Sequence, residues 1–149
     1  MFIEEQGALL SAITDRLEVV APPGWNRLDL KYMTIGDNDF GGSSAVVFNK
    51  REQVIGIWKP PSDVDDMFAQ LRAGMARPER GAWIKAEYFL YYPDYYSIEY
   101  FRDIPSSNFH SEHLPSPSDC ARELELFPRA AEHIPSWMQE LLEKARDVG

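Results

Sequence analysis

The hydrophobic positions at the start of the chain repeat with the period of an amphipathic helix. Leu10, Ile13 and Leu17 lie three or four residues apart, and charged side chains occupy positions between them. The sequence Pro22-Pro23-Gly24 follows, and such a sequence ends a helix. The pattern therefore predicts a helix over residues 3–20.

After this helix the period of the apolar positions changes to two. Leu28, Leu30 and Tyr32 alternate with charged residues, which is the pattern of a half-buried strand. Two short apolar runs follow at residues 44–48 and 53–58, and the four polar residues between them favour a hairpin loop. These three segments predict an antiparallel meander of three strands.

A second helix is predicted after this meander. Ser62 is a suitable N-cap residue, and acidic residues follow it in the first turn, where the helix dipole favours negative charge. The acidic residues are Asp63, Asp65 and Asp66. A single apolar stripe then continues to Met75, and residues 77–81 are expected to end the helix.

Alternating apolar positions return after the second helix and predict another hairpin, with its turn at Pro93-Asp94. One face of the first predicted strand carries Ile84, Ala86, Tyr88 and Leu90, and the facing strand continues the pattern with Tyr96, Ile98 and Tyr100. Residues 103–118 are rich in Pro and Ser and carry no periodicity, so they predict an exposed loop.

Two short helices complete the predicted order. Ser118 or Asp119 is expected to cap the first, and Pro135 is expected to begin the second. The resulting order, α-βββ-α-ββ-αα, predicts a single α+β domain over residues 1–149. Its antiparallel sheet would have about five strands, with the helices packed on it.

The charge balance bears on the choice of partner. Fifteen Lys and Arg residues oppose 24 Asp and Glu residues, which gives a net charge of −9. Such a surface repels phosphate backbones, so we expect no direct binding of nucleic acid. It attracts basic proteins, although acidity also serves simply to keep many cytoplasmic proteins soluble.

Other totals narrow the class of protein. The start of the chain lacks the pattern of a secretory signal, and no apolar run approaches the roughly 18 residues needed to span a bilayer. We therefore expect a cytoplasmic protein with no membrane partner. A single cysteine excludes an intrachain disulfide and a Cys-rich zinc site. No glycine-rich phosphate loop is present, and we expect no cofactor.

One pattern suggests a metal-dependent nuclease. Asp29-Leu30-Lys31 lies on a predicted strand with Asp15 upstream, and such sites use carboxylates to hold Mg²⁺ and a lysine to stabilise the phosphate. The alternative is that these residues are the polar face of an amphipathic strand. The triplet is common and the acidic surface opposes DNA binding, so we favour the alternative.

Three further patterns have simple structural explanations. The segment from His110 to His113 contains two histidines and a glutamate but lacks helical pattern, so solvated loop histidines are the better interpretation. Capping of a helix accounts for the aspartates after Ser62 without a metal ion. Cys120 has no positioned histidine indicated by spacing, so a structural or surface thiol is favoured over a nucleophile. We therefore predict no catalytic and no metal-binding residue.

Aromatic residues crowd the second predicted hairpin. About half of them must face the core, and the others would lie on a sheet face or edge, where exposed aromatic rings are typical binding anchors. We predict Tyr91, Tyr92 and Tyr95 as partner-binding residues. Asp63, Asp65 and Asp66 are added as candidates for electrostatic attraction of a basic partner.

Several short segments, in this order and spacing, resemble one protein family. They are Pro23-Gly24-Trp25 with the strand that follows, Gly81-Ala82-Trp83, Tyr95–Arg102 with Asp103-Ile104-Pro105, Glu123–Arg129, and Ile134–Met138. The chain resembles the YezG-like immunity proteins, which are antitoxins of bacterial polymorphic toxin systems. The resemblance implies a protein that binds a cognate toxin domain and blocks its active site, and the toxins are often nucleases.

The sequence leaves alternatives open. One is immunity to a toxin that consumes nicotinamide dinucleotide, another is an adaptor that binds proteins without any toxin, and the least favoured is the metal-dependent nuclease.

Overall fold

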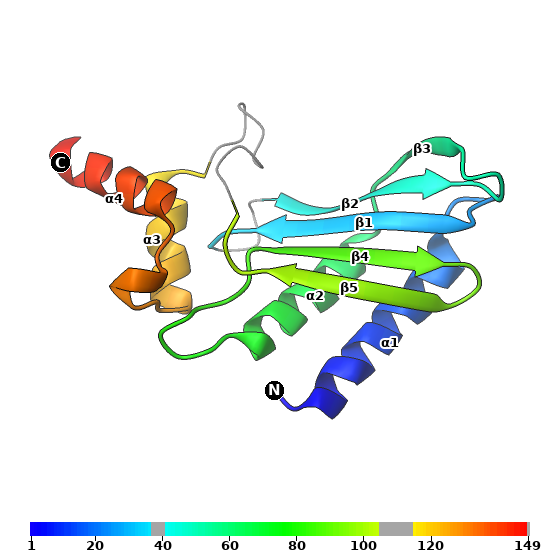
Figure 1. The fold of residues 1–149 in the computed structure, drawn as a ribbon, viewed down its shortest axis with the longest axis horizontal. Coiled ribbons are helices and arrows are strands. Elements are labelled where there is room, and N and C mark those ends of the chain that lie inside the picture. Colours follow the sequence, from blue (N-terminus) through cyan, green and yellow to red (C-terminus); the bar gives the residue numbers. More distant parts are fainter. Residues whose placement is uncertain (37–40, 105–114, 149) are drawn as a thin grey trace.

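The protein consists of a five-stranded antiparallel sheet with two long helices on one face and a helical arm at one end (Figure 1). The computed structural model describes residues 1–36, 41–104 and 115–148. Its elements are α1 (Ile3–Val20), β1 (Arg27–Thr34), β2 (Gly41–Phe48), β3 (Val54–Trp58), α2 (Ser62–Met75), β4 (Lys85–Tyr91), β5 (Tyr95–Phe101), α3 (Pro117–Leu126), the short helix η2 (Ala131–His133) and α4 (Ser136–Val148). The predicted α+β class and element order are confirmed.

Strand β1 is the centre of the sheet, whose strand order is β3-β2-β1-β4-β5. It pairs with β2 on one side and with β4 on the other, so the second hairpin extends the predicted meander. Leu28 lies opposite Val47 in one neighbour and Leu90 in the other. All three side chains are buried, because residues in register share a face of a pleated sheet.

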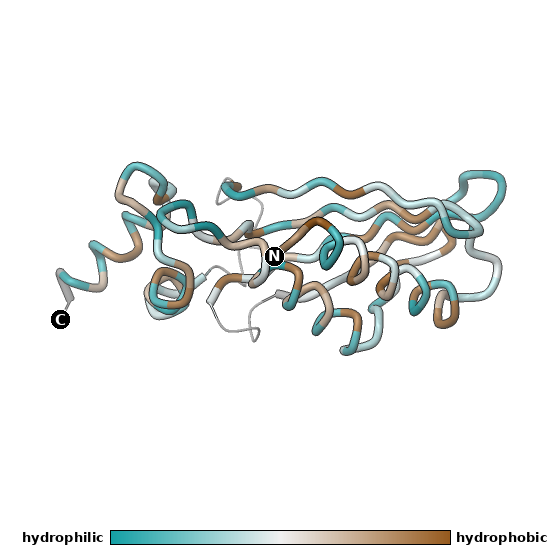
Figure 2. Tube along the Cα trace, turned by 90° about the horizontal axis from the view of Figure 1, so that it is seen from below, coloured by the Kyte–Doolittle hydropathy of each residue, from teal (hydrophilic) through white to brown (hydrophobic). Residues whose placement is uncertain are grey.

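The main core lies between the sheet and the two long helices, which form the second layer in Figure 2. Ile13 and Leu17 from α1 and Phe68 from α2 are fully buried there. The ring of Tyr32 stacks on Phe68 with centroids 5.2 Å apart. The helical period of the apolar residues therefore buries one stripe of each helix against the sheet, as predicted.

A second core cluster joins the C-terminal arm, made of α3, η2 and α4, to the end of the sheet. Its buried members are Ile35, Ile84, Ile104, Cys120 and Met138. Trp137 packs against this cluster, and its indole nitrogen donates a hydrogen bond to the carbonyl oxygen of Ile104 at 2.8 Å. The arm is thus part of the folded body.

A buried ion pair between Arg72 of α2 and Glu123 of α3 reinforces this junction. Their side chains are only 3% and 0% exposed. Glu123 also accepts a hydrogen bond from the backbone nitrogen of Gly36 at 2.8 Å, and Arg72 donates one to the carbonyl oxygen of Trp83 at 2.7 Å. Both charges therefore have polar partners besides each other, which a buried pair needs in order to offset its desolvation.

Arg129 makes a second buried connection between the arm and the sheet. Its guanidinium donates to the Asp103 carboxylate at 2.5 Å and to the carbonyl oxygens of His133, Ala82 and Arg102 at 2.9–3.0 Å. The side chain packs on Gly81, where an added Cβ would come within 2.7 Å of it. Glycine at position 81, with φ of +74°, is therefore required both by the backbone and by this contact.

The predicted helix caps are wrong in detail. Pro61 occupies the cap position of α2 without a side-chain hydrogen bond, and Ser62 is the first helical residue. The cap of α3 is Ser116, neither Ser118 nor Asp119. Its hydroxyl accepts from the backbone nitrogen of Asp119, whose carboxylate accepts from the backbone nitrogen of Ser116. Pro117 at the start of the helix favours this position, since proline fits the first helical turn.

Burial in helix α3 does not follow the polarity of its side chains. The apolar Leu126 is 39% exposed, whereas the charged Glu123 is fully buried. The predicted loop at 103–118 falls largely on residues 105–114, which lie outside the described residues. Among the helices that are described, none combines the length and apolar character needed to cross a bilayer.

The Arg72–Glu123 pair gives a direct test of the junction. Glu123→Gln should lower the free energy of unfolding by about 3–5 kcal/mol, because Arg72 stays buried without its counter-charge. Urea denaturation followed by tryptophan fluorescence measures this loss. The control is Glu125→Gln in the same helix, which removes an exposed pair with Arg122 and should cost less than about 1 kcal/mol. Equal costs for the two variants would contradict the assignment.

Candidate protein-binding surface

The hairpin of β4 and β5 carries three exposed tyrosines, Tyr91, Tyr92 and Tyr95, which we call the tyrosine patch. Their exposed fractions are 40%, 61% and 67%. Tyr91 and Tyr95 are register partners at the end of the ladder, with ring centroids 5.8 Å apart. The hairpin therefore presents aromatic rings to solvent at the end of the sheet opposite the C-terminal arm (Figure 1).

The other tyrosines of this hairpin face the helices. Tyr88 is fully buried and shares a hydrogen bond of 2.5 Å with the hydroxyl of Thr14 in α1. Tyr96 stacks on Tyr88, and Tyr100 packs against Trp83. Burial raises the pKa of Tyr100 to about 12, which keeps its hydroxyl neutral. The prediction that about half of the cluster faces the core is confirmed.

Beside Tyr92 lies an open pocket of about 670 Å³. Its walls are the connection from α1 to β1, the loop between β2 and β3, and Tyr92 itself. The lining residues are Ala21, Pro22, Pro23, Gly24, Trp25, Asn49, Lys50, Arg51, Gln53 and Tyr92. The Trp25 ring meets Tyr92 edge to face with centroids 5.3 Å apart. The pocket thus combines an aromatic wall with two cationic side chains.

The local hydrogen bonds explain why the loop at this pocket keeps its shape. The side-chain oxygen of Asn49 accepts from the backbone nitrogens of Arg51 and Gln53, at 2.9 and 3.0 Å. Glu52 takes a positive φ of 58°, which lets the chain reverse between the two strands. A loop tied in this way offers a preformed surface, so binding there would not have to order it.

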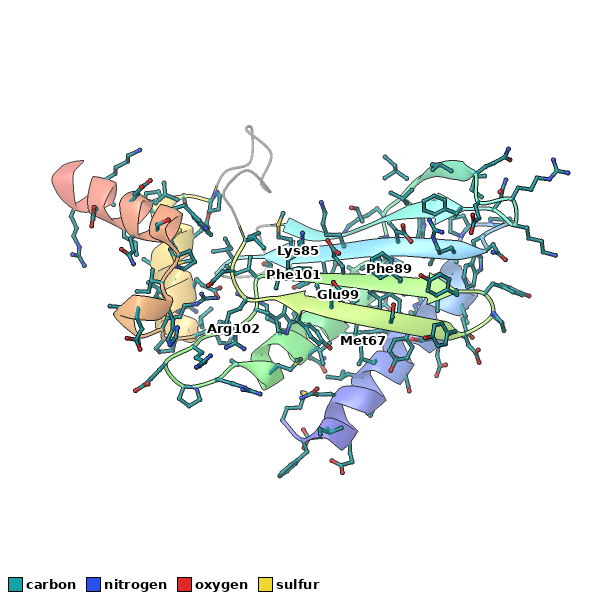
Figure 3. The ribbon with its side chains drawn as sticks, viewed as in Figure 1. Met67, Lys85, Phe89, Glu99, Phe101 and Arg102 are labelled. Carbon is teal, nitrogen blue, oxygen red and sulfur yellow. The ribbon has the colours of Figure 1, made fainter. Side chains whose placement is uncertain are left out.

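The side of the sheet turned away from α1 and α2, which we call the open face, continues the tyrosine patch. Figure 3 views the sheet from this side, with Phe89, Glu99 and Phe101 on it. Ile57 in the edge strand β3 is 82% exposed. Opposite charges also pair along this face, as in the contact of Arg27 with Asp29 at 3.0 Å. The face is therefore a mixture of apolar side chains and paired charges.

The three aspartates proposed for partner binding are not near the tyrosine patch. Asp63 pairs with Arg16 of α1 at 2.7 Å, and Asp65 binds Lys59 and both the backbone nitrogen and the hydroxyl of Ser43. Asp66 is exposed. All three belong to α2, on the helix side of the sheet (Figure 1).

The separation is also large along the sheet. Ser43, bound by Asp65, pairs with Tyr32 of β1, whereas Tyr91 pairs with Arg27. These two β1 positions lie roughly 17 Å apart at the usual rise of a strand. The structure brings the three tyrosines together but does not join them to the aspartates.

The residues of the nuclease pattern lie on different layers. Asp29 and Lys31 are on the open face, in a shallow hollow of about 170 Å³ shared with Glu87 and Phe89. Asp15 is exposed on α1, beyond the sheet. In the part of the chain that the structure describes, no group of three or more His, Cys, Asp or Glu side chains could hold a metal ion. The segment His110–His113 lies outside the described residues.

Cys120 is fully buried in the second core cluster. Burial, together with the nearby charges of Asp119 and Glu123, raises the pKa of its thiol to about 12. Of the two roles left open by the sequence, the structural thiol is therefore the correct one.

Several residues of this surface were not predicted from the sequence. Trp25, Lys50 and Arg51 line the pocket, and Ile57 contributes to the open face. Within the run at 53–58, the consecutive positions 54–58 carry no polar side chain, which indicates a strand without a polar face. Its position at the sheet edge follows only from the pairing of the strands.

Comparison of the sequence with protein-family models finds no match, and comparison with curated protein sequences finds none either.

The buried thiol can be tested by its chemical reactivity. Since the thiolate is the nucleophile, Cys120 should not react with a disulfide reagent at about pH 8 while the protein is folded. One thiol per chain should react promptly after unfolding in guanidinium chloride. Release of the reagent's chromophore measures both reactions. Rapid stoichiometric reaction of the folded protein would contradict the burial of this side chain.

Proposed function

We propose that this protein is an immunity protein that binds a cognate toxin domain, most readily a nuclease, through the tyrosine patch. The observation that carries the proposal is the exposure of Tyr91, Tyr92 and Tyr95 at one end of the sheet. The family resemblance of the sequence supplies the class of partner.

Exposed tyrosines suit this role for physical reasons. Each ring offers a large apolar area with few rotatable bonds, and its hydroxyl can form a hydrogen bond with the partner. Contacts with Trp25 and between Tyr91 and Tyr95 already restrict the rings in the free protein. Less side-chain entropy is therefore lost when a partner binds. The adjacent pocket could receive a side chain that projects from the partner.

The charge of the chain favours a basic partner. The net charge is −9, and exposed carboxylates such as Asp66 and Asp15 lie on the helix layer. Their field acts over about 8–10 Å at physiological salt, so it would speed the encounter more than it would strengthen the final contact. A nuclease domain, which must itself attract phosphates, has the complementary charge.

Co-expression tests the proposed function directly. We expect the chain to protect cells from the toxic product of the neighbouring reading frame. Tyr91→Ala and Tyr95→Ala should weaken protection and raise the rate of dissociation from the purified toxin domain about tenfold or more. Surface plasmon resonance measures the dissociation rate.

The matched control for these variants is Phe2→Ala. Phe2 is an exposed aromatic residue, 73% accessible, next to α1 and away from the hairpin. The Phe2→Ala variant should leave the rate of dissociation from the toxin domain unchanged. Failure to protect cells, or hydrolysis of DNA or RNA by this protein alone with Mg²⁺, would reject the immunity function. Equal effects of all three variants would reject the tyrosine patch as the contact.

Salt dependence tests the electrostatic part of the proposal. Between about 0.05 and 0.5 M salt the association rate should fall steeply, and Asp66→Asn should lower it at low salt. Asp65→Asn is expected to lower stability instead, because Asp65 holds Ser43 and Lys59. Stopped-flow fluorescence gives the association rates. A rate insensitive to salt would indicate a partner without a basic cleft, such as a toxin that consumes nicotinamide dinucleotide.

A further inference from the structure

Four arginines gather where the C-terminal arm meets the sheet: Arg77, Arg80, Arg102 and Arg129. Arg80 and Arg129 form an isolated antiparallel bridge, and Arg77 bridges Gly81 within the turn after α2. Arg129 also donates a hydrogen bond to the carbonyl oxygen of Arg102 at 3.0 Å. Residues far apart in the sequence are therefore brought to one place, at the end of the sheet shown by the Arg102 label in Figure 3.

The charges in this cluster are not balanced within it. Arg129 is buried and pairs with Asp103. Arg77, Arg80 and Arg102 make no ion pair with any residue in the described ranges 1–36, 41–104 and 115–148. Glu79 lies in the same turn and is exposed. In a chain with a net charge of −9, this local excess of positive charge is unusual.

Repulsion among the guanidinium groups affects the pKa of Arg102. Partial burial lowers the pKa of its guanidinium, and the charges of Arg129, Arg77 and Arg80 lower it further, while Asp103 acts in the opposite direction. An anion bound among the guanidinium groups would relieve this repulsion.

The backbone holds the cluster in place. The nitrogen and oxygen of Arg77 bond to the oxygen and nitrogen of Gly81, at 3.0 and 2.9 Å. The carbonyl oxygen of Glu79 accepts from the backbone nitrogen of Ala130 at 2.6 Å. The turn is thus tied both to itself and to the arm, so the arginines are carried by a frame that forms without a ligand.

We propose that Arg77, Arg80 and Arg102 bind the phosphate group of a small phosphorylated molecule, with the buried Arg129 positioning the backbone beneath them. A single guanidinium satisfies a carboxylate, whereas a phosphate monoester carries about two charges and three oxygens that can engage several arginines. The net charge of the chain opposes a long polyanion such as nucleic acid. The site lies at the opposite end of β5 from Tyr95 and does not depend on the proposed immunity function.

Isothermal titration with inorganic phosphate and with phenyl phosphate tests the site, with sodium chloride at equal ionic strength as the blank. We expect saturable binding of one anion per chain. Arg80→Gln and Arg102→Gln should each raise the dissociation constant for the phosphate about tenfold or more, because each removes a charge-assisted contact. The control, Arg146→Gln, removes the same charge from an exposed position of α4 and should leave the constant unchanged. Circular dichroism checks that every variant is folded.

Three results would overturn this proposal. They are the absence of saturable binding, an equal loss in the Arg146→Gln control, and binding of a single-stranded oligonucleotide that is tighter than that of phenyl phosphate and sensitive to Arg80→Gln. The last result would assign the arginines to nucleic acid.

Discussion

The buried ion pair between Arg72 and Glu123 decides where the C-terminal third of the chain lies. Two charges removed from water are unfavourable unless other polar groups complete their coordination. The backbone nitrogen of Gly36 and the carbonyl oxygen of Trp83 supply those groups, and both sit at one end of the sheet. The pair is therefore satisfied only when α3 docks at that end, which makes it a determinant of one particular arrangement.

This docking leaves the rest of the sheet surface available. Helices α1 and α2 bury the side of the sheet that carries Leu28 and Leu90, while the arm is held at the end by Glu123 and Arg129. The tyrosine patch at the hairpin end, and Phe89 and Ile57 on the open face, consequently belong to neither core cluster. The same packing that stabilises the body thus exposes the tyrosine patch and the pocket beside it.

The two ends of the sheet also differ in chemistry. One end carries the tyrosine patch with Trp25, where the binding energy would come from apolar area and a few hydrogen bonds. The other end carries the arginine cluster, where binding would depend on charge. The acidic side chains of α2 lie on the helix layer, away from the tyrosine patch. In the proposed complex, long-range attraction and close contact would therefore come from different surfaces.

Local patterns were sufficient for the elements. The helical repeat of Leu10, Ile13 and Leu17 predicted α1, and alternation predicted the two strands of the β4–β5 hairpin. Such periods record the geometry of a single helix or strand, so they can be recognised in the sequence without knowledge of the neighbours. The α+β class followed from the order of the elements.

The candidate sites depended on contacts between distant residues. Nothing near Glu123 in the sequence marks it as a buried partner of Arg72, and the capping box at Ser116 was one of several caps that the local sequence allowed. The pairing of β1 with β4 decided that the aspartates of α2 and the tyrosine patch lie apart. Hydrogen bonds between strands and buried charge pairs join residues without regard to their separation along the chain, so only the folded arrangement selects among the possible partners.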